Sequence, residues 1–384
     1  MNTLDQIRPA LRLWPLAALL AGLLWLGQVG WSHAADTTPL CRFGVGASQA
    51  IGSYPIGNMR FGWYADWGAT LEPYRSPGMA YLPMVRFKMT GPNTYSATPT
   101  GQQLIDMARN NPGALWVVGN EPDRKLFQDG LEPQVYARAY HDLYYQIKAA
   151  DPTARVAAGS IVQPTPLRLQ YLDLVLNSYR AQFGESLPVD VWNIHAFILR
   201  EMSCNYDPNS CWGADVPPGI DAPYGMLYGI QDNDNIEVFK QFIGDFRQWM
   251  QSRGYQDKPL IITELGILMP ADYGFDTARV NAFMNKTFDY LLTAAGPSGY
   301  PSDGNRYVQQ FAWYSLDDTL FNGPLFDNQT RQPTAFGQNY AAYTAQVASK
   351  INFQATTASV QITRRGPGVD IRVVTRFVNN GNVR

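Results

Sequence analysis

Residues 114–123 read ALWVVGNEPD, an apolar run that stops abruptly at Asn120, Glu121 and a proline. Residues 260–266 read LIITELG and have the same form, with Glu264 at the end of the apolar run. Short, continuous apolar runs rich in β-branched residues are typical of parallel strands that are buried on both faces. Each run therefore predicts a buried parallel strand that ends on a carboxylate.

Eight such runs follow one another along the chain, and segments with helical periodicity separate most of them. Alternating strands and helices are the sequence form of repeated βα units, and eight units predict an α/β fold of the (β/α)8, or TIM barrel, type. The first connection is short and holds Gly and Pro instead of a clear helix. The expected strands lie near residues 42–46, 61–66, 82–87, 114–119, 155–159, 189–195, 260–264 and 308–314.

The expected helices begin at recognisable capping residues. Thr100 and Asp276 precede apolar stripes at helical spacing, and Pro133 suits the first turn of another helix. A Gly-, Pro- and Asn-rich insertion, residues 199–235, follows the sixth strand. Long loops at the carboxyl ends of barrel strands usually shape the active site, so we expect the insertion to lie beside it.

The chain divides into three parts by pattern. Residues 1–35 carry Arg8 and Arg12 before an apolar run and small residues after it, as in a signal peptide. The run is also nearly long enough to cross a bilayer, which leaves an uncleaved N-terminal anchor open. Both alternatives predict an extracellular or periplasmic catalytic domain over residues 36–350. Residues 351–384 alternate around Gly366-Pro-Gly and predict a short C-terminal β-hairpin or a truncated β-module.

Composition limits the partners. Charged residues make up 16% of the chain and the net charge is -2, so no positive field exists to attract nucleic acid. Membrane contact is expected only if the N-terminal segment stays uncleaved. The three Cys predict a Cys204–Cys211 disulfide inside the insertion and leave Cys41 as a buried thiol. With three His in the chain, we expect no metal centre and no cofactor.

The two strand-end carboxylates carry the chemistry. Side chains at the carboxyl ends of barrel strands project into the active site, and strands four and seven bring Glu121 and Glu264 to opposite sides of the barrel mouth. Two opposed carboxyl groups are what glycosidic cleavage requires, one to protonate the departing oxygen and one to attack the anomeric carbon. The alternative is a pair of structural, salt-bridged glutamates.

The Asn-Glu pair on strand four and the Glu on strand seven resemble glycoside hydrolase clan A, the retaining (β/α)8 glycosidases; the family within the clan is not assigned. The resemblance covers residues 40–350. It implies that Asn120 binds the sugar 2-hydroxyl, that Glu121 is the acid/base and that Glu264 is the nucleophile. It predicts a secreted enzyme that hydrolyses O-glycosidic bonds of a polysaccharide or oligosaccharide.

Strands six and eight supply further candidates. His195 ends strand six, where clan members often carry a His with a nearby Tyr. This chain has Phe197 at the Tyr position, so it lacks the usual hydroxyl contact to the nucleophile unless Tyr224, Tyr228 or Tyr273 supplies it. Trp313 in strand eight resembles the clan's sugar-stacking Trp. The alternatives are a core histidine satisfied by backbone and simple packing of the indole.

Three other residues are candidates for sugar binding by position alone. Trp67 follows strand two and Arg86 lies in strand three, so both could face the cavity, and Trp212 in the insertion could be an outer stacking platform. A rim salt bridge for Arg86 and loop packing for Trp212 are the alternatives.

The electrostatics of a retaining site make two expectations explicit. An ionised Glu264 should raise the pKa of Glu121 and keep it protonated, and the carboxyl groups should lie about 5–5.5 Å apart, against about 6.5–9.5 Å for inversion. The rival class is a catalytically inactive carbohydrate-binding barrel. A nucleotide-binding oxidoreductase would need a third glycine at a fixed offset after Gly44-Val-Gly46, and the sequence does not have it. A serine hydrolase would need a Gly-x-Ser-x-Gly elbow, which the sequence also lacks.

Overall fold

The computed structural model describes residues 37–126, 128–349, 353–365, 368–379 and 381–382. The predicted leader, residues 1–35, lies outside the described residues, so export of the chain stays a prediction. Within the described residues, no helix combines the length and the apolar character that crossing a bilayer demands.

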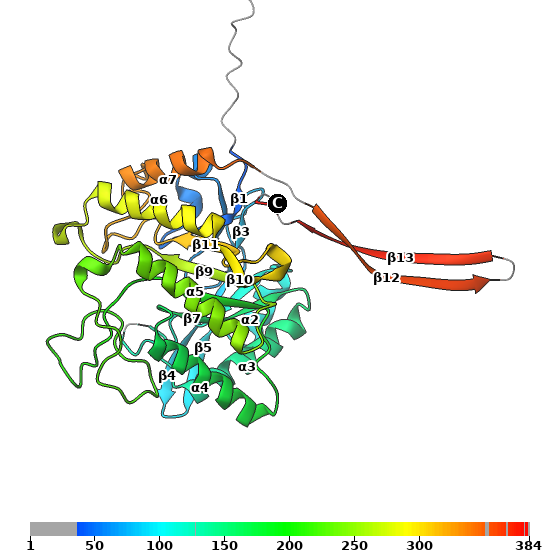
Figure 1. Cartoon of the computed structure of the whole chain (residues 1–384), viewed down its shortest axis with the longest axis horizontal. Helices are drawn as coiled ribbons and strands as arrows, with labels where there is room; N and C mark the ends of the chain where they lie inside the picture. The colour runs from blue at the N-terminus through cyan, green and yellow to red at the C-terminus, as the bar shows by residue number, and fades with distance from the viewer. Residues whose placement is uncertain (1–36, 127, 350–352, 366–367, 380, 383–384) are drawn as a thin grey trace, which may run out of the picture. The chain divides into compact units, whose positions relative to one another are not determined.

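Eight parallel strand positions form the centre of the molecule (Figure 1). Seven of the eight predicted strands appear as single strands close to their expected positions, and the third is split into a strand of two residues and one of eight. The strands are β1 (Leu40–Gly46), β2 (Phe61–Ala65), β3 (Ala80–Tyr81) with β4 (Met84–Gly91), β6 (Leu115–Val118), β7 (Arg155–Ile161), β8 (Val191–His195), β9 (Leu260–Leu265) and β11 (Gln310–Trp313).

The split third strand closes the sheet into a barrel. In sheet order, β3 stands at one end beside β2, and β4 stands near the other end beside β6. Only Leu82 and Pro83 separate β3 from β4. The Leu82 amide donates to the Tyr64 carbonyl (2.9 Å), and the Pro83 carbonyl accepts from the Val117 amide (2.9 Å). One segment therefore bonds to both neighbours, and the ring of parallel strands is continuous.

Helices follow most strands and bury one face against the barrel (Figure 1). The predicted starts are confirmed, because Thr100 and Asp276 are N-caps and Pro133 opens its helix. Between β1 and β2 only two 3-10 turns occur, as the Gly- and Pro-containing connection predicts. The helices are α2 (Gly101–Asn110), α3 (Pro133–Ala150), α4 (Pro166–Phe183), α5 (Ile236–Ser252), α6 (Thr277–Thr293) and α7 (Ala335–Gln346).

The core has two layers, as expected of a barrel wrapped by helices. Inside the barrel, side chains from seven strand positions pack together around Trp63, which is fully buried against Gly44 of β1. A larger apolar layer fills the space between the barrel and the helices. The inner cluster consists of Trp63, Ala65, Leu82, Met84, Leu115, Val117, Ala157, Val191, Ile261 and Ala312.

Two further strand pairings and one short strand complete the described strands. β5 (Thr94–Thr98) pairs antiparallel with β4, and β10 (Ala295–Tyr300) follows α6. After α7, β12 (Phe353–Arg365) and β13 (Gly368–Asn379) pair antiparallel (Figure 1). The division into catalytic domain and C-terminal segment, and the role of that segment, stay predictions.

Candidate active site

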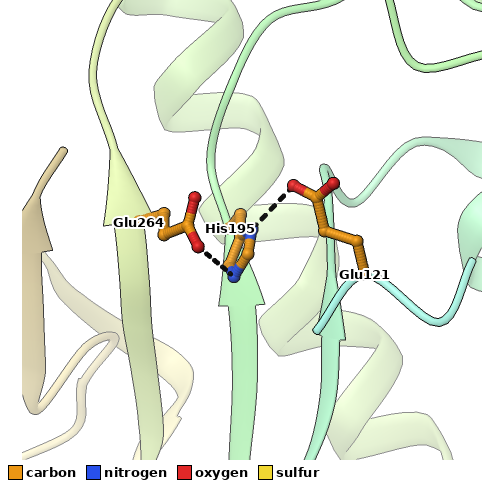
Figure 2. A group of neighbouring side chains, drawn as sticks. All are labelled: Glu121, His195 and Glu264. Carbon is orange, nitrogen blue, oxygen red and sulfur yellow. Dashed lines mark hydrogen bonds and ion pairs between the residues drawn. The ribbon is translucent and has the colours of Figure 1, made fainter. Parts of the chain in front are cut away.

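The predicted carboxylates lie together at the carboxyl edge of the barrel. Glu121 follows β6 and Glu264 lies near the end of β9, with His195 from β8 between them (Figure 2). Glu121 is 2% exposed, Glu264 5% and His195 0%. The ends of β6, β8 and β9, with β7 between the first two in the sheet, thus deliver two acids and one imidazole to a single buried spot at the carboxyl edge of the barrel.

His195 bridges the two acids (Figure 2). Its Nδ1 lies 3.0 Å from Glu121 Oε1, and its Nε2 lies 3.5 Å from Glu264 Oε1. One ligating atom from each of the three residues falls within 4.8 Å of the others. The three residues are thus close enough to hold a metal ion, and in this arrangement the imidazole itself contacts both carboxylates.

A tryptophan steadies the nucleophile candidate. The Trp67 indole donates to Glu264 Oε1 at 2.6 Å. This is the donor that Phe197 cannot supply; Phe197 instead packs edge-on against His195 and Tyr314. Trp67 and Glu121 both have left-handed backbone conformations, with φ of 55° and 46°. Such strain in non-glycine residues gathers at functional sites.

A mostly polar cavity of about 290 Å³ lies between the acids, lined by Trp67, Arg86, Glu121 and Glu264 among others. We call it the catalytic cavity, after the role proposed for it below. Arg86 faces it and is held by Asp129 (2.7 Å) and Gln128 (3.0 Å). Gln128 also accepts from Asn120 Nδ2 (2.9 Å), while Asn120 Oδ1 is buried with no hydrogen-bond partner among the described residues. A buried, unsatisfied acceptor on a cavity wall suits a ligand hydroxyl.

The other predicted residues fall into two groups, those that line the catalytic cavity and those that do not. Trp67, Arg86 and Asn120 line the catalytic cavity, whereas Trp313 and Trp212 do not. Trp313 is 1% exposed and donates to the Gly323 carbonyl (2.9 Å), because its side chain points from β11 into the layer under the helices. Its neighbour Tyr314 lines the cavity instead, edge-on to Trp67.

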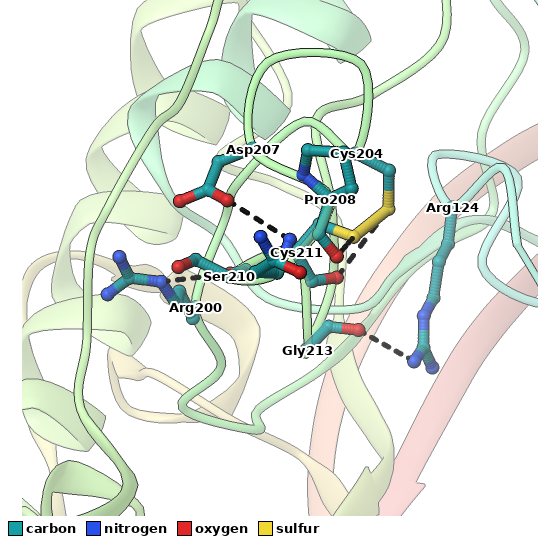
Figure 3. The surroundings of a disulfide bond; sticks show 9 residues. Arg124, Arg200, Cys204, Asp207, Pro208, Ser210, Cys211 and Gly213 are labelled. Carbon is teal, nitrogen blue, oxygen red and sulfur yellow. Dashed lines mark hydrogen bonds between the residues drawn. A yellow bond between two sulfur atoms is a disulfide. The ribbon is translucent and has the colours of Figure 1, made fainter.

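Sequence reasoning missed Arg124, three residues after Glu121. Its guanidinium lies 3.2 Å from Glu121 Oε2 and donates to the Gly213 carbonyl of the long insertion at 2.8 Å (Figure 3). Gly213 follows the Cys204–Cys211 disulfide, whose predicted pairing is confirmed. Cys41, predicted to be buried, is half-buried and its thiol contacts the Gly381 carbonyl.

The pKa pattern corrects an expectation. Burial raises the pKa of Glu121, but the hydrogen bond and charge of His195 and the charge of Arg124 outweigh burial and lower it. Burial and the charge of Glu121 raise the pKa of Glu264. Burial alone would lower the pKa of His195, yet the two carboxylates raise it. The pKa of Glu121 thus shifts opposite to the expected direction, because the expectation did not include the effects of His195 and Arg124.

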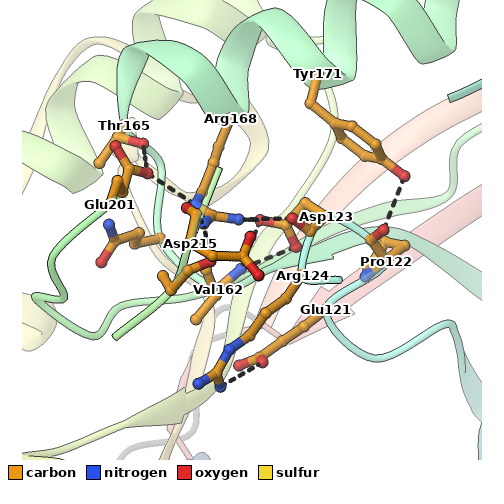
Figure 4. Close-up of polar contacts among 12 residues, drawn as sticks. Glu121, Pro122, Asp123, Arg124, Val162, Thr165, Arg168, Tyr171, Glu201 and Asp215 are labelled. Carbon is orange, nitrogen blue, oxygen red and sulfur yellow. Dashed lines mark hydrogen bonds and ion pairs between the residues drawn. The ribbon is translucent and has the colours of Figure 1, made fainter. Parts of the chain in front are cut away.

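Buried charges fix the loop that carries Glu121 (Figure 4). Arg168 of α4 pairs with Asp123 and, at 2.8 Å, with Glu201, and all three side chains are fully buried. Arg168 also donates to the carbonyls of Ala214 (2.6 Å) and Asp215 (2.8 Å). One guanidinium thus joins the loop after β6, α4, and the start and middle of the long insertion.

Comparison with known proteins supports the fold. No family model and no curated protein matches the chain. A GH128 (subgroup II) endo-β-1,3-glucanase from Pseudomonas viridiflava is 16% identical and aligns over 79% of this chain and 98% of its own, with a TM-score of 0.51. One from Sorangium cellulosum is 18% identical over 79% and 98%, with a TM-score of 0.50. The resemblance to the clan A barrels is thereby confirmed for the fold.

Proposed function

We propose that this chain is a retaining glycoside hydrolase that cleaves O-glycosidic bonds by double displacement, with Glu121 as acid/base and Glu264 as nucleophile. One observation carries the proposal: an oxygen of each carboxylate lies within 4.8 Å of an oxygen of the other, across a buried polar cavity. That spacing favours direct attack by Glu264 over the wider inverting arrangement, which leaves room for a water molecule.

The proposed reaction has two steps. Glu121 gives its proton to the glycosidic oxygen, the C–O bond breaks, and Glu264 bonds to the anomeric carbon. The leaving alcohol departs. Glu121, now ionised, takes a proton from water, the resulting hydroxide displaces Glu264 from the sugar, and both carboxyl groups return to their starting states.

His195 supplies a route to the reactive protonation state. Since Nε2 faces Glu264 and Nδ1 faces Glu121, the imidazole can accept a proton from Glu264 while it gives one to Glu121. The transfer leaves Glu264 ionised for attack and Glu121 protonated for leaving-group departure. A substrate that enters between Arg124 and Glu121 favours the same direction, because it weakens the cationic contact that holds Glu121 ionised.

The test is hydrolysis of a panel of polysaccharides and oligosaccharides by the full chain, Glu121→Ala and Glu264→Ala. We expect both variants to lose about 10²–10⁴-fold in kcat. Azide should restore turnover in Glu264→Ala and give a glycosyl azide of inverted configuration. Glu237→Ala is the matched control, because Glu237 is an exposed glutamate of α5.

The rival function makes the opposite prediction. If none of the proteins cleaves any glycan, yet all bind one glycan equally well, the chain is a carbohydrate-binding barrel. An azide product of retained configuration would remove Glu264 from the nucleophile's role.

A further inference from the structure

A second cavity adjoins the catalytic cavity. It encloses about 500 Å³ and shares three lining residues with its neighbour, namely Arg124, Leu268 and Phe321. We call it the apolar cavity; its other side chains include Leu199, Trp212, Met269, Tyr273 and Leu320. The shared residues place the two cavities side by side, so a ligand that extends past these residues reaches from one cavity into the other.

One residue of the shared wall, Arg124, lies on the acid/base side of the site. Arg124 contacts Glu121 Oε2 with one arm of its guanidinium and Gly213, a lining residue of the apolar cavity, with the other (Figure 3). In the proposed reaction the acid/base protonates the oxygen of the leaving group, which therefore lies next to Glu121. The apolar cavity is thus placed to receive the leaving group.

The two cavities differ in chemistry. The catalytic cavity presents Arg86, Asn120, Gln128 and two carboxylates, enough polar groups for the hydroxyls of a sugar. In the apolar cavity most side chains are aliphatic or aromatic, and the polar groups are those of Arg124, Tyr273 and the indole of Trp212. An alkyl or aryl group gains from covering these side chains, whereas the hydroxyls of a sugar ring find few hydrogen-bond partners among them.

The mouth of the apolar cavity leaves large hydrophobic side chains in water. Leu320 is 71% exposed, Tyr273 49% and Trp212 37%. Clustered exposed apolar groups beside a polar cavity are typical of a ligand site, since a bound apolar group would cover them.

We infer that the substrate is a glycoside with an apolar leaving group, whose sugar lies in the catalytic cavity and whose alkyl or aryl aglycone lies in the apolar cavity. The inference rests on the proposed function and replaces the sugar leaving group of the predicted polysaccharide or oligosaccharide with an apolar one. Glu121 protonates the aglycone oxygen, the anomeric C–O bond breaks, and an alcohol or phenol leaves through the apolar cavity.

The first arm of the test measures binding and needs no turnover. Titration of the full chain with octyl, phenyl and methyl β-glucosides, below the micelle concentration, should give octyl and phenyl dissociation constants at least ten times lower than methyl. Burial of about two methylene groups accounts for a tenfold gain. Leu320→Asn should reduce the octyl-to-methyl ratio several-fold. Leu71→Asn is the matched control, because Leu71 is 45% exposed and lines neither cavity.

The second arm measures kcat/KM on the same three glucosides and on an oligosaccharide panel. Faster cleavage of the octyl or phenyl compound, lost in Leu320→Asn and kept in Leu71→Asn, supports the inference and shows which kind of aglycone is preferred. Oligosaccharide cleavage with equal octyl and methyl binding overturns the inference and leaves the proposed function standing. Octyl preference that depends on Leu320, without cleavage of any glycoside, overturns the proposed function and keeps the apolar site.

Discussion

At the scale of single residues, the environment of each carboxylate is built by side chains that lie outside the sequence motifs. Glu121 has a cation and an imidazole beside it, whereas Glu264 has one indole donor at 2.6 Å and a distant imidazole nitrogen. The pH dependence of activity should therefore respond to Arg124 and Trp67 separately.

Arg124→Gln removes a positive charge that lowers the pKa of Glu121. The pKa of Glu121 should rise, and because Glu121 must be protonated to act as the acid, the basic limb of kcat/KM against pH should move to higher pH. The acid limb should move less. Arg253→Gln, which breaks an exposed ion pair with Asp173 on the outer helices, should leave the profile unchanged. A basic limb that does not move would show that Arg124 has no influence on Glu121 during catalysis.

Trp67→Phe removes the indole hydrogen bond that lowers the pKa of Glu264. The pKa of Glu264 should rise, so the acid limb should move to higher pH. A hydrogen bond to a charged group contributes about 1.5–3 kcal/mol, so kcat should fall roughly 10- to 100-fold. Trp249→Phe is the control, because Trp249 donates to the Asp173 carboxylate away from the cavity (2.9 Å). Equal kinetics of the two variants would contradict the assignment.

The positions of strand ends made part of the site predictable from sequence. Glu121, Glu264 and His195 converge because parallel strands end at one edge, which periodicity alone predicts. Arg124 was missed because it follows its strand in a loop, and no periodicity governs where a loop side chain points. The proline after Glu121 and the charged pair Asp123-Arg124 were the available hint.

At the scale of elements, Arg168 joins α4 to two irregular segments. The helix itself was predictable from its apolar stripe, but the buried contacts with Asp123 and Glu201 depend on the path of the insertion. β5 and β10 were missed because both are short: β5 alternates but has only five residues, none of them fully buried, and Pro297 interrupts β10.

Arg168→Met should destabilise the protein by about 3–5 kcal/mol, because it leaves two buried carboxylates without their cation. Urea unfolding followed by tryptophan fluorescence measures the loss. Arg253→Met should cost less than about 1 kcal/mol, because the paired side chains are partly exposed: 38% for Arg253 and 33% for Asp173. Similar losses in the two variants would mean that the buried network adds nothing beyond a surface ion pair.

At the scale of the whole molecule, the strands contribute side chains of very different size to the interior of the barrel. Trp63 extends from β2 across the interior, and a Cβ at Gly44 would stand 2.2 Å from its ring. Eight strands were predictable because each is an apolar run. The sequence did not predict that β1 needs a glycine at position 44 to make room for the Trp63 indole, because this fit depends on which residues become neighbours in three dimensions.

Gly44→Ala should therefore destabilise the barrel by about 1–3 kcal/mol or more, because the methyl group forces Trp63 to move within a closed interior. Gly57→Ala is the control, since its Cβ would meet nothing within 4 Å. Thermal unfolding should show a clear loss for the first variant and little change for the second, and the smaller ring in Gly44→Ala/Trp63→Phe should recover part of the loss. An unchanged midpoint for Gly44→Ala would contradict this account of the interior.

The pairing of β1 with β11 has a consequence for synthesis of the chain. Phe43 stands opposite Phe311, so the first strand made has its final neighbour only when nearly the whole barrel has left the ribosome. At about 5–20 residues per second, that delay is on the order of ten seconds to a minute. Throughout it, the edge of β1 that β11 will cover stays open to other chains. We expect the nascent protein to be a client of holding chaperones and its yield to fall when translation is slowed between Leu265 and Trp313.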